Sequence, residues 1–223
     1  RSYRITYRTR LLSRILAPLT SFPCRDKDEL YRGAKKIRWE EFLSQKKTLA
    51  VSANVSESSI THSQFAALRV KDAIADYFVD RTNRRPNVDT QNPFIEINLH
   101  IHKNLANLSI DVSGGTLHKR GYREESVSAP MQETVAAAII RLSEWDGTQP
   151  LYDPMCGSGT LLCEALMAHC QIPAQVFRTR FGFKRLPDFD PSLWENIKKE
   201  LNENILPLPG NLIAGSDVSD KAV

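Results

Sequence analysis

Residues 151–166 read LYDPMCGSGTLLCEAL, and this stretch decides the fold of the second half of the chain. A short apolar strand ends at Asp153, a turn holds Gly157 and Gly159, and an apolar, helix-forming run follows. Strand, glycine turn and helix make the βα unit that opens a doubly wound sheet, where ligands bind beyond the carboxyl ends of the strands. Glycine lets the backbone approach a ligand closely because it has no Cβ. The stretch therefore predicts a ligand site at this turn.

The residues after the turn narrow the class of ligand. Position 162 is Leu, where a dinucleotide-binding fingerprint has its third glycine. No Lys follows the turn, although a phosphate-binding loop requires one. The turn therefore favours a nucleoside-like ligand without phosphate over a pyrophosphate.

Asp217 is the predicted acidic partner of this turn. It ends the apolar stretch NLIAGSD, residues 211–217, where an acid of this fold accepts hydrogen bonds from ribose hydroxyls. It lies 58 residues after Gly159 instead of the usual separation of about 20, so an insertion must lie between them. Asp190 is the alternative acid, but Asp followed by Pro is typical of a helix N-cap. Asp153 either meets the ligand or caps the loop amides, and both can hold.

The first half of the chain predicts a separate α/β unit. A basic helix leads into a strand around residues 11–22. Helices follow over 26–37 and 62–82, with a strand over 48–55 between them. Residues 94–103 and 105–113 alternate as a hairpin that turns at Lys103 and Asn104. The apolar face predicted for the helix over 62–82 consists of Phe65, Leu68, Ala73, Ile74, Tyr77 and Phe78.

The composition indicates a soluble globular protein, with 41% hydrophobic and 25% charged residues. No apolar run is long enough to span a bilayer, and no signal segment follows Arg1. The four cysteines include no C-x-x-C pair and no zinc-ligand spacing, so we expect no metal site and a reducing, cytoplasmic location. Because the chain lacks an initiator Met and stops at Val223, we expect a fragment of a longer protein.

The charge is divided unevenly along the chain. Residues 1–123 carry 22 Lys and Arg against 12 Asp and Glu, whereas residues 124–223 carry 8 against 14. A basic first half suits a polyanion such as nucleic acid. The alternative is that these charges are spread over a solvated surface, and charge alone leaves the two open.

Residues 153–166 resemble motif I of S-adenosylmethionine-dependent methyltransferases. The chain as a whole resembles the branch in which a THUMP RNA-binding domain precedes a Rossmann-like RNA methyltransferase domain. Its nearest likeness is to bacterial 23S ribosomal RNA guanine-N2 methyltransferases. The further matching stretches are THSQFAALRVKDAI (61–74), LHKRGYR (117–123), APMQETVAAAII (129–140), RFGF (180–183), DPSLW (190–194) and GSD (215–217).

The resemblance implies an α/β fold in four parts. Residues 1–25 would be the remnant of a ferredoxin-like region, and residues 26–112 an α+β THUMP domain. Residues 113–130 would be a linker, rich in Gly, Ser and charge. Residues 131–223 would be the first part of a doubly wound, Rossmann-like methyltransferase domain.

The resemblance also implies which residues bind the cofactor, S-adenosylmethionine. Asp217 would hold the ribose hydroxyls, and the helix start at 131–134 would lie near the methionine end. The alternative, which is equally favoured, is that these residues only cap the N-terminus of the helix and do not contact the cofactor. The residues implied at the cofactor are Asp153, Pro154, Cys156, Gly157, Ser158, Gly159, Thr160, Asp217, Gln132 and Thr134, with Met131 and Glu133 beside them.

The activity implied is methyl transfer to the exocyclic N2 of a guanine in 23S ribosomal RNA. In this family an Asn-Pro-Pro-Tyr motif holds the base, and no Asn-Pro-Pro occurs in the chain. We therefore assign no catalytic residue and expect this chain alone to be inactive. Transfer RNA guanine and DNA adenine are alternative substrates, and a non-catalytic RNA-binding module with a vestigial cofactor fold is an alternative function.

RNA contacts are expected on the basic part of the chain, chiefly to the phosphate backbone. The candidates lie on the helix over 62–82, just after it, and in the linker. They are Arg69, Lys71, Arg84, Arg85, Lys119, Arg120 and Arg123.

Overall fold

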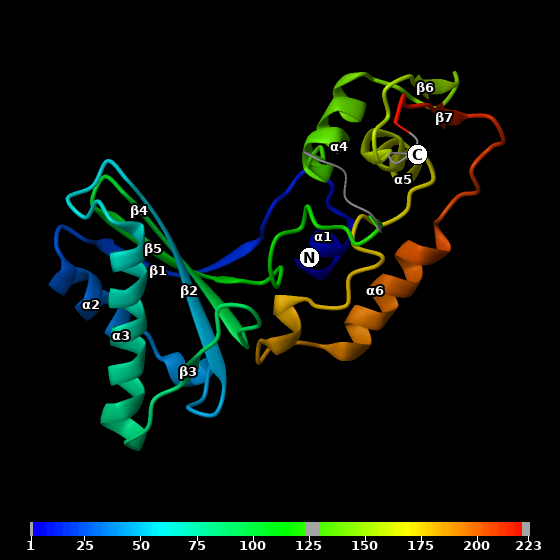
Figure 1. Cartoon of the computed structure of the whole chain (residues 1–223). Helices are drawn as coiled ribbons and strands as arrows, with labels where there is room; N and C mark the ends of the chain where they lie inside the picture. Colours follow the sequence, from blue (N-terminus) through cyan, green and yellow to red (C-terminus); the bar gives the residue numbers. More distant parts are fainter. Residues whose placement is uncertain (1, 124–129, 220–223) are drawn as a thin grey trace. The chain divides into compact units, whose positions relative to one another are not determined.

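The computed structural model describes residues 2–123 and 130–219, which form two compact units (Figure 1). The five-stranded unit consists of Arg14–Gly115 and Phe181–Phe189. The two-stranded unit consists of Arg1–Ser13, Thr116–Arg180 and Asp190–Val223. None of the helices in the described part of the chain is long and apolar enough to cross a membrane.

The five-stranded unit is built on a mixed sheet. Its strand order is β1 (Leu16–Pro23), β5 (Leu105–Asp111), β4 (Ile95–His102), β2 (Thr48–Ser56) and β3 (Asn87–Val88). The β1–β5 and β5–β4 pairs are antiparallel, and the β4–β2 and β2–β3 pairs are parallel. Alternation of side chains along β4 buries one face of the strand, so its isoleucines and Leu99 join the core while the residues between them are more exposed.

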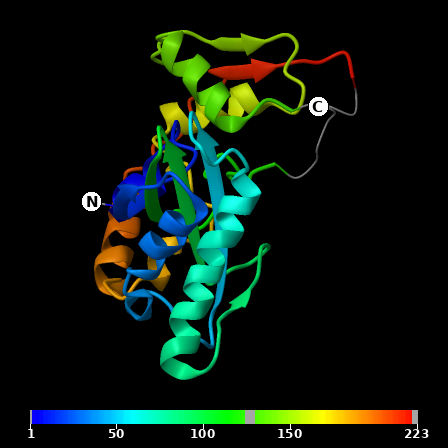
Figure 2. The same ribbon diagram turned by 90° about the vertical axis from the view of Figure 1, so that its left-hand side faces the viewer.

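Two helices, α2 (Lys27–Lys35) and α3 (Ser63–Thr82), cover one face of this sheet (Figures 1 and 2). The carboxylate of Asp26 caps α2 by accepting hydrogen bonds from the amides of Asp28 and Glu29. The predicted core positions Tyr77 and Phe78 are buried, whereas Phe65 and Leu68 are 46% and 50% exposed. The prediction was wrong for these two because the buried stripe of α3 begins at Ala66 and Val70 instead.

The predicted hairpin turn is confirmed. Lys103 and Asn104 join β4 to β5, and their φ angles are 50° and 57°. Two consecutive positive φ angles characterise the tight turn that matches the twist of paired strands. The sequence did not predict β3 or the two 3₁₀ turns, Trp39–Glu41 and Gly182–Arg185, because such short elements carry little periodicity.

The two-stranded unit pairs β6 (Leu151–Asp153) with β7 (Ile213–Gly215) in parallel. The strand β6 leads into α5 (Thr160–His169), which packs against α4 (Glu133–Leu142). The helix α6 (Pro191–Glu203) begins as predicted, with Asp190 accepting a hydrogen bond from the amide of Leu193. These elements confirm the predicted α/β fold class.

Residues 2–13 pack into the two-stranded unit. The helix α1 (Ser2–Arg8) lies against α6. The rings of Tyr3 and Tyr7 pack nearly perpendicular to that of Trp194, at centroid distances of 6.2 Å and 5.4 Å. The Tyr7 hydroxyl also bonds to the Asn202 side chain at 2.9 Å. The segment predicted as one remnant, 1–25, is thus divided, because β1 belongs to the five-stranded sheet.

The described part of the predicted linker, residues 113–123 and 130, is largely packed. Ser113, Leu117 and Arg120 are completely buried, so residues 113–120 are not a flexible spacer. Residues 124–129 of the predicted linker lie outside the described residues.

Candidate cofactor site

The glycine loop connects β6 to α5. Gly157 and Gly159 have φ angles of 52° and 70°, values that side chains disfavour. A Cβ added at either glycine would meet no atom within 4 Å, so one side of the loop is open. Gly159 occupies the N-cap position of α5 and provides no side-chain cap, which leaves the first amides of the helix available to a ligand.

Backbone hydrogen bonds hold this loop against the end of β7. The amide of Ser216 donates to the carbonyl of Asp153 at 2.9 Å, and the amide of Cys156 donates to the carbonyl of Ser216 at 3.0 Å. Because β6 and β7 are parallel, their carboxyl ends meet at the same edge. The loop and the segment 216–217 therefore share one site, as the sequence predicts.

Asp217 is bonded directly to the loop. Its Oδ2 accepts a hydrogen bond from the amide of Gly157 at 2.8 Å, and its Oδ1 accepts one from the amide of Ser219 at 3.0 Å. These two amides, of which Ser219 has the larger effect, lower the pKa of the carboxyl. Asp217 is thus an ionised acceptor, and each oxygen keeps a further lone pair for a ligand hydroxyl.

Asp153 caps the start of the loop. Its Oδ1 accepts a hydrogen bond from the amide of Met155 at 3.0 Å. This contact matches the capping interpretation of Asp153, and it leaves the second carboxylate oxygen for other partners. Pro154 is exposed, while Cys156 and Ser158 are partly buried along the same loop.

Arg123 links the loop to the start of α4, and the sequence did not predict this role. Its Nη2 donates to Thr160 Oγ1 at 3.0 Å and to the carbonyl of Met131 at 3.1 Å. The same nitrogen lies 3.6 Å from a carboxylate oxygen of the buried Glu133. The cluster brings the predicted helix start to the cofactor loop. The sequence could not predict this contact, because an Arg in a glycine- and charge-rich segment has no pattern that identifies its partner.

Gln132 and Thr134 are placed at the start of α4 without a contact that fixes their role. Gln132 is the N-cap residue, but its exposed side chain makes no cap hydrogen bond, so the capping alternative is not realised there. Thr134 is partly buried in the first turn. Their contact with a cofactor remains a prediction.

These observations fit a nucleoside-type cofactor. The loop offers an open glycine backbone, uncapped helix amides and an ionised carboxylate at the neighbouring strand end. Such a set can bind hydroxyl groups and a polar, uncharged ring edge by hydrogen bonds. Among residues 2–123 and 130–219, no group of three or more His, Cys, Asp or Glu side chains could hold a metal ion.

Five of the seven predicted RNA contacts fall into three groups. Arg120 is completely buried and paired with Glu164, and this contradicts its predicted contact with RNA. Arg123 is engaged at the cofactor loop, as described above. Lys119, Arg84 and Arg85 are exposed.

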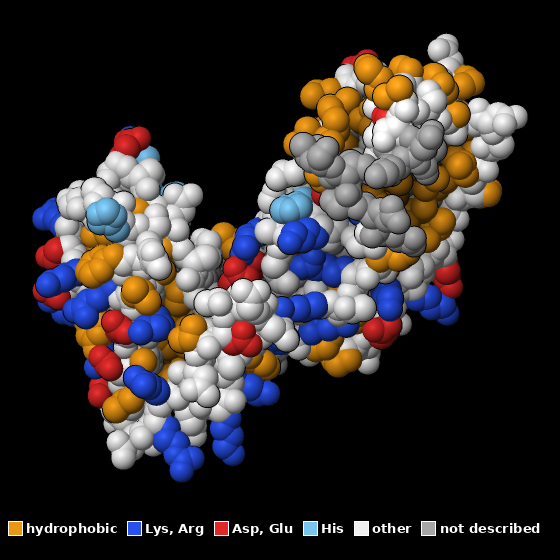
Figure 3. Space-filling model, viewed as in Figure 1, with side chains coloured by type: hydrophobic (Ala, Val, Ile, Leu, Met, Phe, Trp, Pro, Cys, Tyr) orange, Lys and Arg blue, Asp and Glu red, His pale blue; other side chains and the backbone are white. Residues whose placement is uncertain are grey.

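The remaining candidates line a groove of the five-stranded unit. Arg69, Lys71 and Arg85 line this groove together with Asp72 and Asp76. Arg69 pairs with Asp28 at 3.1 Å and lies over the ring of Tyr31, while Lys71 pairs with Asp72 at 2.6 Å. The groove therefore carries mixed charge, and Arg69 and Lys71 are each paired with a nearby carboxylate. Figure 3 shows side chains of both charges over α2 and α3.

Two family models match consecutive parts of the chain. The first is the THUMP domain, over residues 24–111. The second is described as the RMKL-like methyltransferase domain, over residues 120–223. The glycine loop, Asp217 and the buried Arg120 all lie within the second match.

Curated relatives and a solved structure agree with these matches. Ribosomal RNA large subunit methyltransferase K/L of Vibrio campbellii is 44% identical over 90% of this chain and 28% of its own length. The protein slr0064 of Synechocystis sp., an RNA methyltransferase by name, is 43% identical over 87% of this chain and 51% of its own length. The crystal structure of SMU.472 complexed with SAH has a TM-score of 0.84 at 29% identity, over 99% of this chain and 58% of that one.

The chain thus spans between about a quarter and three fifths of the proteins that it resembles. The two family models follow each other in the same order as the five-stranded sheet and the glycine loop. The chain therefore carries a region that matches the THUMP domain, followed by a region that matches the RMKL-like methyltransferase domain.

Proposed function

We propose that this chain is part of an S-adenosylmethionine-dependent RNA methyltransferase that acts in the cytoplasm. The observation that carries the proposal is the hydrogen bond between Asp217 and the amide of Gly157, because it joins the two halves of a cofactor site at one sheet edge. A relative named as a ribosomal RNA methyltransferase and a structural neighbour solved with SAH support the same assignment.

In this proposal the open glycine loop and Asp217 hold the cofactor. The amides at Gly157 and Gly159 and the start of α5 would bind its methionine and ribose portions, and the Asp217 carboxylate would accept from the ribose hydroxyls. Bound S-adenosylmethionine supplies an activated methyl group on a sulfonium. The protein's contribution is to position that group against the RNA nitrogen and exclude water.

The acceptor that we propose is the exocyclic N2 of a guanine in 23S ribosomal RNA. The named K/L relative supports ribosomal RNA as the substrate class. The THUMP match and the basic first half of the chain support RNA binding. A base inside folded RNA must be turned out of its stack before methylation.

Two experiments test the proposal at separate points. Titration calorimetry of the chain with S-adenosylmethionine tests the cofactor site, and we expect binding that Asp217→Ala weakens. The substrate is tested in cells that lack the protein containing this chain. Their 23S RNA and transfer RNA are purified separately, and the nucleosides of each are analysed by mass spectrometry. Loss of N2-methylguanosine from 23S RNA alone supports the proposal, whereas loss from transfer RNA alone makes that RNA the substrate.

The same pair of experiments addresses a purely RNA-binding function. A chain that binds RNA but not S-adenosylmethionine, in cells whose RNA methylation is unchanged by its loss, would be an RNA-binding module with a vestigial cofactor fold. Asp217→Ala would then leave RNA binding unchanged.

A further inference from the structure

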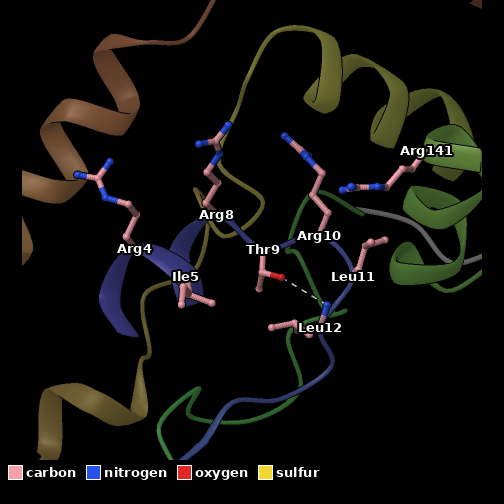
Figure 4. Close-up of a pocket in the computed structure, with 8 residues that line it drawn as sticks. All are labelled: Arg4, Ile5, Arg8, Thr9, Arg10, Leu11, Leu12 and Arg141. Atoms are coloured by element: carbon pink, nitrogen blue, oxygen red, sulfur yellow. Dashed lines mark hydrogen bonds between the residues drawn. The ribbon is translucent and has the colours of Figure 1, made fainter. Parts of the chain in front are cut away.

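A pocket of the two-stranded unit is lined by four arginines. It has a volume of about 590 Å³ and is formed by α1, the segment that follows it, and the last turn of α4 (Figure 4). We call it the arginine pocket. Its lining residues are Arg4, Ile5, Arg8, Thr9, Arg10, Leu11, Leu12 and Arg141. None of these residues is acidic, and none of the four arginines is among the predicted RNA contacts.

Two of the arginines are available at the surface. Arg8 and Arg141 are exposed, and neither side chain makes a hydrogen bond or an ion pair with another residue in the part of the chain that the structure describes. Arg4 differs because it forms a two-pronged pair with Glu200, at 2.7 Å and 2.5 Å. Among the described residues, no carboxylate pairs with the guanidinium groups of Arg8 and Arg141.

Arg10 adds buried positive charge to the pocket wall. Its Nη2 donates to the carbonyls of Met167 and Ile172, both at 2.6 Å, while its Nη1 is buried without a hydrogen-bond partner. Burial lowers the pKa of Arg10 to about 10, and Arg120 and Arg8 add to this effect although Glu164 opposes it. Glu164 is already paired with Arg120, so an external anion would relieve the remaining positive charge.

The pocket also exposes apolar side chains beside these arginines. Ile5, Leu11 and Leu12 are 48%, 43% and 44% exposed. Figure 4 shows the side chains of Arg8 and Arg10 extending to the same side of the segment, with Arg141 reaching in from α4. A small anion would contact the arginines alone, whereas a nucleotide strand would contact both the arginines and the apolar side chains.

We propose that the arginine pocket binds the backbone of an RNA strand. Arg8 and Arg141 bind its phosphates, Arg10 adds positive charge from beneath, and Ile5, Leu11 and Leu12 contact a sugar or base. Guanidinium groups suit this role because their planar donors match phosphate oxygens in pairs. The inference rests on the proposed function in taking RNA as the partner, but it adds a binding surface on the methyltransferase side of the chain.

The test removes the two available charges together. Fluorescence anisotropy with a labelled RNA hairpin, measured over a series of KCl concentrations, gives the affinity and its salt dependence. For the double variant Arg8→Gln and Arg141→Gln, we expect roughly tenfold weaker binding near 0.1 M KCl. The slope of log affinity against log salt should become less steep by about 1.4 to 1.8, since each phosphate contact contributes about 0.7 to 0.9.

A matched control removes two charges elsewhere. Arg38 and Lys199 are 74% and 75% exposed and lie outside the arginine pocket, so Arg38→Gln with Lys199→Gln changes the net charge equally. This control should keep nearly all of the affinity and slope. Arg8→Lys with Arg141→Lys should recover most of the slope, because it restores both charges. Retained S-adenosylmethionine binding by every variant would show that the cofactor site is intact.

Other results would overturn the inference. Equal RNA affinity and slope in native and Gln variants would do so, provided that the native chain binds the hairpin. Thermal stabilisation by inorganic phosphate that needs Arg8 and Arg141, with RNA binding unchanged, would make the pocket a free-anion site. Binding of polyglutamate that needs the same residues, with RNA unaffected, would assign it to an acidic protein. A native chain that binds no RNA would contradict the RNA partner of the proposed function itself.

Discussion

Arg120 Nε lies 2.9 Å from Glu164 Oε1, and both side chains are completely buried. The same guanidinium donates to the carbonyl of Thr9 at 3.2 Å and to that of Arg10 at 2.6 Å. One side chain thus ties α5 to the N-terminal segment of the two-stranded unit. Arg120 stabilises the unit that carries the cofactor loop and has no surface to offer to RNA.

Replacing Arg120 by Met should strongly destabilise the two-stranded unit. It would leave Glu164 as a buried charge without its partner, and breaking a buried pair in this way costs about 3–5 kcal/mol. Urea unfolding followed by fluorescence measures the loss. Lys119→Met is the matched control, since Lys119 is the exposed neighbour and surface substitutions usually change stability by less than about 0.5 kcal/mol.

The double variant Arg120→Met with Glu164→Met separates the charge from the packing. Because it removes both buried charges, it should be more stable than Arg120→Met alone. If the single and double variants unfolded at the same urea concentration, the loss of stability would come from the hydrogen bonds of Arg120 to the carbonyls, and not from its ion pair with Glu164.

Much of the fold is predictable because its signals are local. The Lys103–Asn104 turn, the Asp190 cap and the alternation along β4 are each set by a few adjacent residues. The glycine loop and Asp217 are also predictable, since the ends of neighbouring parallel strands must meet. These signals predict the elements and the position of the candidate cofactor site.

Contacts between distant segments are not predictable in this way. Arg120 and Arg8 are indistinguishable in the sequence because both lie in basic stretches, yet Arg120 is buried and Arg8 is exposed. What separates them is Glu164, a residue 44 positions away on α5. The same holds for Phe65 and Leu68, which fit a helical stripe but lie beside the buried face of α3.

Asp217→Ala should weaken binding of S-adenosylmethionine by about tenfold or more. The variant removes a charged acceptor, and hydrogen bonds to charged groups are roughly twice as strong as those between neutral groups. Titration calorimetry gives the affinity. Asp146→Ala is the control, because Asp146 likewise accepts a backbone amide, that of Thr148 at 2.9 Å, but does so in an exposed turn. Equal losses in the two variants would remove Asp217 from the cofactor site.

The stabilising contribution of Asp217 should persist to acidic pH. Its pKa is lowered by the amides of Ser219 and Gly157, so the folded carboxyl stays ionised below the unfolded value of about 3.9. The contribution is therefore complete above about pH 4 and is lost as the pH falls through the lowered folded pKa. Urea midpoints of the native chain and Asp217→Asn, measured from pH 7 to acid, should differ by a constant amount until about pH 4. A difference that shrinks already between pH 7 and 5 would contradict the assignment.

Gly182→Ala should destabilise the five-stranded unit by about 1–3 kcal/mol, the usual cost of forcing an extra carbon into a packed site. A Cβ at Gly182 would lie 2.3 Å from the carbonyl oxygen of Asp111 and 2.8 Å from the amide of Gly114, and backbone atoms cannot move aside easily. Gly210→Ala is the control, because a Cβ there would meet nothing within 4 Å. Thermal unfolding of both variants measures the difference. The amide of Phe183 donates a hydrogen bond to the carbonyl of Val112 at 2.9 Å, which indicates that the segment 181–189 lies against the end of β5. Equal unfolding temperatures of Gly182→Ala and Gly210→Ala would contradict this packing.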